Sequence, residues 1–90
     1  MERVRNIQIR NKLGLHARAA GKIVELSNRF DSQLFLKKDG KEVDGASILS
    51  ILTLSCPKGT EIQVRIVGED SEAFMEELGD LFEQKFGEEG

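Results

Sequence analysis

Residues 60–67 alternate between apolar and polar side chains, and this pattern constrains the fold more than any other stretch of the chain. Three aliphatic residues, Ile62, Val64 and Ile66, occupy every second position, with charged or polar residues between them. Because successive side chains of a strand point to opposite faces, this strand buries one face and exposes the other. An antiparallel sheet can leave one face open to water, so we expect helices to cover one side of the sheet only.

The rest of the chain predicts three further strands and three helices. Ile7 and Ile9 share a face of a first strand, with Val4 out of phase, and the dipeptide Asp39-Gly40 is typical of a two-residue hairpin. Helical spacing of apolar residues predicts helices elsewhere. The last helix carries the stripe Phe74, Leu78, Leu81 and Phe82. The expected strands are 3–9, 32–38, 41–43 and 60–67, and the expected helices are 17–29, 47–54 and one that opens at 68–70.

This order, βαββαβα, predicts one α+β domain over residues 1–90, with three helices on one face of a four-stranded antiparallel sheet. A chain of 90 residues has no room for a deep cleft, so any chemistry is expected at the surface, where a partner protein completes it. The longest apolar stretches are too short to cross a bilayer, and the N-terminus lacks the apolar region of a secretory signal. These features indicate a cytoplasmic protein without membrane insertion.

Cysteine and histidine each occur once, as Cys56 and His16. One cysteine cannot form an intramolecular disulfide, and the two residues together are too few for a structural zinc site. We therefore expect no metal and no cofactor, and we assign no role to Cys56.

Charge is distributed unevenly along the chain. Residues 1–41 contain ten basic and four acidic residues, a net charge of +6, whereas residues 42–90 contain three and twelve, a net charge of −9. A basic half is typical of proteins that bind an acidic partner surface, a phosphate or a nucleic acid. It is equally typical of solvated faces with no partner.

The motif Gly14-Leu15-His16-Ala17-Arg18 places the one histidine where a loop becomes a helix. Helix N-termini expose unpaired N–H groups and hold phosphate well. A neutral imidazole nitrogen is a competent nucleophile, and the helix end and Arg18 both disfavour the charged ring. Arg18 and the N–H groups of Ala17 and Arg18 would then stabilise an added phosphoryl group. On these residues alone, a histidine that merely caps the helix is the commoner outcome.

Three motifs resemble the HPr family, the histidine-containing phosphocarriers of the bacterial phosphoenolpyruvate-dependent phosphotransferase system. They are residues 14–18, residues 40–48 (Gly-Lys-Glu-Val-Asp-Gly-Ala-Ser-Ile) and residues 57–62 (Pro-Lys-Gly-Thr-Glu-Ile). The resemblance implies an open-faced β-sandwich with strand order 1-4-2-3. It also implies that His16 accepts a phosphoryl group from enzyme I and passes it to the A component of an enzyme II. The protein would thus be a carrier and not an enzyme.

One residue of the active-site motif departs from the family. HPr proteins usually have proline after the arginine, and this chain has Ala19. Alanine keeps its N–H, so Ala19 is expected to add one donor near the phosphate at some loss of rigidity. We therefore expect an altered phosphohistidine lifetime or partner preference.

The resemblance also assigns residues outside the motif of His16. Ser47 matches the serine that HPr kinase/phosphorylase modifies in several HPr proteins, although a simple N-cap is the commoner role for such a serine. We expect Leu49 and Leu52 to contact partners, and Ile48 and Ile51 to lie in the core. Lys12 and Lys22 are expected to add electrostatic steering. A monomer is expected.

The main alternative is a small binding or regulatory module, for RNA or protein, that no longer carries phosphate. The chain has five Phe but no Tyr or Trp, and most Phe lie in helical stripes, which disfavours base stacking on the open sheet. Retention of both His16 and Arg18 argues against a descendant that no longer carries phosphate. We expect no nucleic-acid partner. A hydrolase is least favoured, because no Asp or Glu lies near His16 in the sequence.

Overall fold

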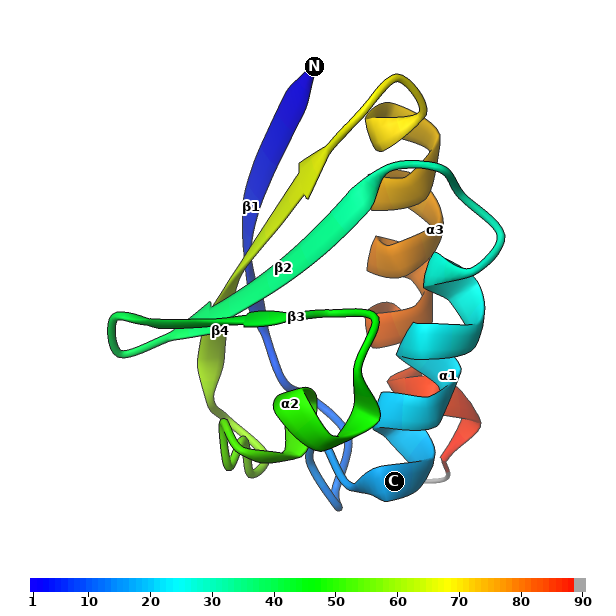
Figure 1. The fold of residues 1–90 in the computed structure, drawn as a ribbon. Coiled ribbons are helices and arrows are strands. Elements are labelled where there is room, and N and C mark those ends of the chain that lie inside the picture. Colours follow the sequence, from blue (N-terminus) through cyan, green and yellow to red (C-terminus); the bar gives the residue numbers. More distant parts are fainter. Residues whose placement is uncertain (89–90) are drawn as a thin grey trace.

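The half-buried strand predicted from residues 60–67 lies inside a four-stranded sheet in the computed structural model, which describes residues 1–88 (Figure 1). The sheet order is β1-β4-β2-β3, and every neighbouring pair is antiparallel. This order confirms the one that the resemblance implied. The elements are β1 (Glu2–Gln8), α1 (Ala17–Ser27), β2 (Gln33–Lys38), β3 (Lys41–Asp44), α2 (Ile48–Leu52), β4 (Glu61–Val67), α3 (Ser71–Glu83) and the 3-10 helix η1 (Lys85–Gly87).

The helices cover one face of the sheet, as Figure 1 shows for α1 and α3. Ile62, Val64 and Ile66 of β4 are almost fully buried beneath them, which confirms the predicted alternation. In the register, Val64 lies opposite Arg5 on one side and Leu36 on the other. The core is therefore one layer between the sheet and the helices, as expected for an α+β fold.

The other face of the sheet is open to solvent. Val4 is half exposed there and lies opposite Arg65, whose guanidinium carbon is 4.3 Å from the centre of the Phe35 ring. This position explains why Val4 is out of phase with Ile7 in the sequence. The side chain belongs to the open face, while Ile7 packs against the core.

Gly79 lies inside α3, where glycine costs roughly 1 kcal/mol relative to alanine. A Cβ atom at this position would be 2.7 Å from Nη1 of Arg5. The glycine therefore leaves room for the end of the Arg5 side chain of β1, which lies against the helix at this position.

The segment after α3 was not predicted. Lys85, Phe86 and Gly87 all have positive φ, at 55°, 57° and 80°, and the chain turns back toward the start of α1. Phe86 is buried and packs edge-on against Phe82, with ring centres 5.1 Å apart. Positive φ is uncommon for residues other than glycine, so the sequence gives little signal for this turn.

Among residues 1–88, no helix is both long enough and apolar enough to span a bilayer.

Candidate functional site

A tight turn presents His16 at the start of α1. Gly14 has a φ of 69°, and a Cβ atom there would be 2.3 Å from the carbonyl oxygen of Cys56, so only glycine fits. The N–H of Leu15 donates to that same carbonyl at 2.8 Å. The side-chain amide of Asn11 donates to the carbonyl of Gly14 at 2.7 Å. These contacts fix the backbone that enters the helix, and His16 becomes its N-cap.

The two ring nitrogens of His16 have different partners. Nδ1 accepts a hydrogen bond from the backbone N–H of Arg18 at 3.2 Å, and Nε2 lies 2.8 Å from a carboxylate oxygen of Glu88. An amide N–H can face only an unprotonated nitrogen, so the geometry assigns the lone pair to Nδ1 and the proton to Nε2. About a quarter of the side chain is exposed. The ring is therefore not enclosed in the core, and its unprotonated nitrogen faces the helix start.

Glu88 is the residue of this site that the sequence did not reveal. Its carboxylate also accepts from the side-chain amide of Asn11 at 2.7 Å and from the backbone N–H of Leu13 at 3.4 Å. The hydrogen bond with His16 is the largest of the causes that lower the pKa of Glu88, and the bond from Asn11 adds to it. Glu88 lies 72 residues from His16 in the sequence. Its contact depends on the turn at η1, for which no motif exists.

The first turn of α1 carries the backbone groups that were predicted to hold phosphate. Ala17, Arg18 and Ala19 are its first three residues, and the first N–H groups of a helix have no intrahelical partner. The N–H of Ala20 is the first to close a helical bond, to the carbonyl of His16 at 2.9 Å. Arg18 is exposed, and within residues 1–88 its guanidinium makes no ion pair.

Ser47 is the N-cap of α2. Its hydroxyl oxygen accepts from the N–H of Ser50 at 3.2 Å, and the residue is half-buried. The structure thus shows the capping role that the sequence favoured. Phosphorylation of Ser47 stays a prediction.

The apolar residues of α2 are distributed differently from the prediction. Leu49 is 77% exposed, whereas Leu52 is half-buried against the core. Ile51 is fully buried, as expected, but Ile48 is 39% exposed, so the prediction that Ile48 lies in the core was wrong. With five residues, α2 is too short to bury two neighbouring isoleucines beneath itself.

The two predicted steering lysines have different surroundings. Lys12 is exposed in the loop before His16. The ammonium of Lys22 donates to the backbone carbonyl of Phe86 at 2.5 Å, so it anchors the turn that carries Glu88.

The basic half of the sequence is partly neutralised within the fold. Three arginines of the N-terminal half form ion pairs with three glutamates of α3, namely Arg3–Glu72, Arg10–Glu83 and Arg29–Glu77. Such exposed pairs contribute little to stability. They do show that the net charge of +6 does not form one uninterrupted basic surface.

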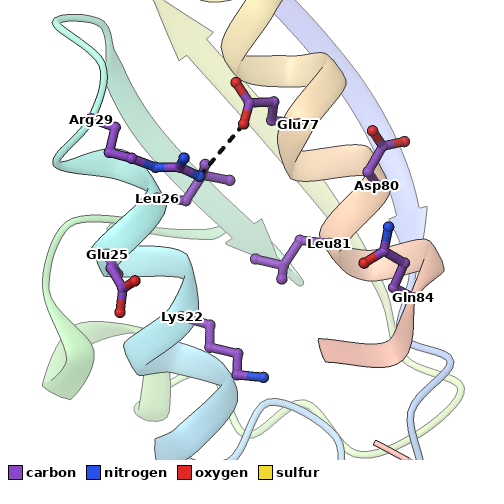
Figure 2. A pocket seen from close by; sticks show the side chains of 8 residues that line it. All are labelled: Lys22, Glu25, Leu26, Arg29, Glu77, Asp80, Leu81 and Gln84. Atoms are coloured by element: carbon purple, nitrogen blue, oxygen red, sulfur yellow. Dashed lines mark hydrogen bonds and ion pairs between the residues drawn. The ribbon is translucent and has the colours of Figure 1, made fainter. Parts of the chain in front are cut away.

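A groove of about 420 Å³ lies between α1 and α3, with the Arg29–Glu77 pair across its rim (Figure 2). Of the predicted site residues, only Lys22 lines it. The lining side chains carry both signs of charge, and the groove does not include His16. The groove is therefore separate from the site at His16.

No three side chains among His, Cys, Asp and Glu gather into a set that could hold a metal ion in residues 1–88. Cys56 is buried, and burial raises the pKa of its thiol, which disfavours the thiolate form.

Comparison with known proteins agrees with this geometry. Residues 4–84 match the family described as PTS HPr component phosphorylation site. The chain belongs to the HPr family. It is 43% identical to the phosphocarrier protein HPr of Xylella fastidiosa strain Temecula1, over 92% of this chain and 93% of that protein. HPr proteins are phosphocarriers of the phosphotransferase system, which relay a phosphoryl group and are not catalysts in their own right.

Solved HPr structures share the fold. The crystal structure of HPr-C-His from Thermoanaerobacter tengcongensis has a TM-score of 0.93 and 40% identity, and covers 98% of this chain and 99% of that one. An HPr dimer from the same organism has a TM-score of 0.77 and 41% identity, and covers 91% and 94% of the two chains. The predicted HPr-like fold is thereby confirmed.

Proposed function

We propose that this chain accepts a phosphoryl group on His16 from enzyme I and passes it to the A component of an enzyme II. The observation that supports this most strongly is the lone pair of Nδ1, directed at the amide of Arg18 in the first turn of α1. An anion bonded to Nδ1 would lie where helix N–H groups and the exposed Arg18 can stabilise it.

The transfer needs no proton to leave the ring. The lone pair of Nδ1 leaves its hydrogen bond with the N–H of Arg18 and forms a bond to phosphorus. At the same time the bond from phosphorus to the donor nitrogen of enzyme I breaks and returns its electron pair to that nitrogen, and the released N–H can donate to the phosphoryl group. Phosphoryl transfer depends mainly on positioning and on stabilising the charge of the equatorial oxygens. The N–H groups of Ala17, Arg18 and Ala19 and the guanidinium of Arg18 would supply this stabilisation on the carrier side.

An apolar surface near His16 would receive both partners. Leu13 and Leu49 are each more than 60% exposed, and Ile48 is partly exposed. Ile48 lies beside α1, since its Cδ1 atom is 3.9 Å from where a Cβ of Gly21 would stand. Where exposed apolar side chains lie together, they favour a protein contact site. We therefore propose that Leu49 is the main contact for enzyme I and the enzyme II component. Leu52 and Lys12 would contribute less to this contact.

We further propose that residues 1–90 act as one carrier domain in the cytoplasm, as a monomer that binds no nucleic acid. A monomer leaves the helix start and Leu49 accessible to two successive partners.

Incubation with phosphoenolpyruvate and a compatible enzyme I, followed by intact mass measurement, tests the proposal. The expected result is an acid-labile gain of one phosphate that is absent in His16→Ala and present in Ser47→Ala. A chain that stays unmodified, or a gain that persists in His16→Ala, would refute it.

Phosphorylation of Ser47 by an HPr kinase/phosphorylase is a second part of the proposal. A phosphate there would add a charge of roughly −1.5 to −2 beside the exposed residues of α2. We expect Ser47→Asp to slow phosphorylation of His16 by enzyme I, because the new charge opposes docking of an acidic partner surface. Steady-state transfer rates, with Ser47→Ala as the uncharged control, measure the effect; equal rates for Asp and Ala would contradict it.

A further inference from the structure

We infer that Glu88 is a positioning residue for phosphoryl transfer, which holds the proton of His16 on Nε2 and stabilises the positive charge that the ring gains when Nδ1 is phosphorylated. This inference rests on the proposed function and adds a residue to it. The contact that supports it is the 2.8 Å approach of the Glu88 carboxylate to Nε2.

The proton balance of the reaction gives the carboxylate its role. A neutral imidazole with its proton on Nε2 becomes a cation once Nδ1 is bonded to phosphorus, because the Nε2–H is retained. A carboxylate hydrogen-bonded to that N–H fixes the tautomer and stabilises the cation, as the aspartate does for histidine in serine protease triads. Glu88 approaches the opposite nitrogen from the one that reacts, so its charge does not occupy the path of the incoming phosphoryl group.

The surrounding structure holds Glu88 in place. Phe86 is buried and packs against Phe82, and the ammonium of Lys22 donates to the carbonyl of Phe86 at 2.5 Å. Three consecutive residues with positive φ then turn the chain toward His16. These contacts anchor the segment that carries Glu88, so its carboxylate is held in place beside His16.

Asn11 connects the carboxylate to the turn before His16. It is fully buried, and its side-chain amide donates at 2.7 Å both to Glu88 and to the carbonyl of Gly14. The side chain of Glu88 is only 16% exposed. Asn11 therefore bridges the backbone that presents the ring and the carboxylate that faces it, and it holds the two in register.

The experiment combines ring spectroscopy with transfer kinetics on the full chain. In ¹⁵N NMR of the unphosphorylated protein at neutral pH, the neutral ring is expected to show a protonated Nε2 and an unprotonated Nδ1. Glu88→Ala should give a mixture of tautomers and slow transfer from enzyme I by roughly tenfold, the effect of losing one hydrogen bond to a charged group.

Two further variants separate geometry from charge. Glu88→Gln can still accept from Nε2–H through its amide oxygen, so it should keep the tautomer while transfer slows. Glu88→Asp should restore more of the rate than Glu88→Gln does. Glu83→Gln, which removes an exposed acid of α3 that pairs with Arg10, is the matched control and should leave both readouts unchanged.

The spectroscopic readout needs no partner, so it tests Glu88 even if enzyme I does not phosphorylate the chain. A wild-type ring with its proton on Nδ1, an unchanged tautomer in Glu88→Ala, or transfer in Glu88→Ala at or above the wild-type rate would each overturn the inference. Absence of transfer in the wild type, with the tautomer as expected, would instead refute the proposed function.

Discussion

Ala19 is the third residue of α1, fully buried, at a position where HPr proteins usually have proline. Its N–H belongs to the first turn, where no intrahelical carbonyl accepts it, so proline there would break no helical hydrogen bond. What differs is the number of donors beside Nδ1 and the stiffness of the turn. We therefore expect this residue to affect the phosphorylated state more than it affects the helix.

We expect Ala19→Pro to change the lifetime of the phosphohistidine. Loss of one donor near the phosphate should shorten it by about tenfold or more, since a hydrogen bond to a charged group contributes roughly 1.5–3 kcal/mol. Decay of the phosphorylated protein at neutral pH, followed by intact mass, measures the lifetime, and the melting temperature shows whether the fold is kept. Identical lifetimes and transfer rates in a folded variant would mean that Ala19 has no such role.

At the scale of elements, Asp70 connects the start of α3 to the loop before β2. It is the N-cap of α3 but makes no capping bond; its carboxylate instead accepts from the N–H of Asp31 at 2.8 Å and from the N–H and hydroxyl of Ser32. The hydroxyl of Ser32 and the N–H of Asp31 are the main causes that lower the pKa of Asp70.

This connection predicts a dependence of stability on pH. A carboxyl group whose pKa is lower in the folded state stabilises the fold above its unfolded pKa of about 3.9, and this contribution is lost as the pH falls through the lowered value. Asp70→Asn should therefore lower the free energy of unfolding at pH 7 and weaken its decline between about pH 5 and 2. Urea denaturation over this range measures both. Asp80→Asn, on the exposed side of α3, is the control; parallel pH curves for Asp70→Asn and the wild type would contradict the assignment.

The sequence predicted elements whose signals are local. The alternation of β4, the Asp39-Gly40 hairpin and the stripe of α3 each depend on neighbouring residues, and all three are present. His16 and Arg18 were likewise found from one short motif. Glu88 was not, because its contact requires a turn of three residues with positive φ and a separation of 72 residues. Ile48 was misplaced because helical spacing does not reveal how little a five-residue helix can bury.

At the scale of the whole molecule, the fold separates two surfaces that each carry an exposed aliphatic side chain. The open face of the sheet carries Val4 at 52% exposure, among polar neighbours and the Arg65–Phe35 contact. Leu49 is instead exposed on α2, which packs against α1, the helix that His16 caps. Val4 and Leu49 are both exposed aliphatic residues, so they form a matched pair for testing which surface the partners contact.

We expect Leu49→Ala to raise the KM for phosphorylation by enzyme I by about tenfold, equivalent to roughly 1.4 kcal/mol, with little change in kcat. The reason is that a truncated contact weakens docking but leaves His16 and the first turn of α1 intact. Stability should be nearly unchanged, because the side chain is mostly solvated in the free protein. Val4→Ala should change neither KM nor kcat. If Val4→Ala raised KM and Leu49→Ala did not, the open sheet face would be the docking surface, and the phosphoryl group would have to reach His16 from a partner bound away from α2.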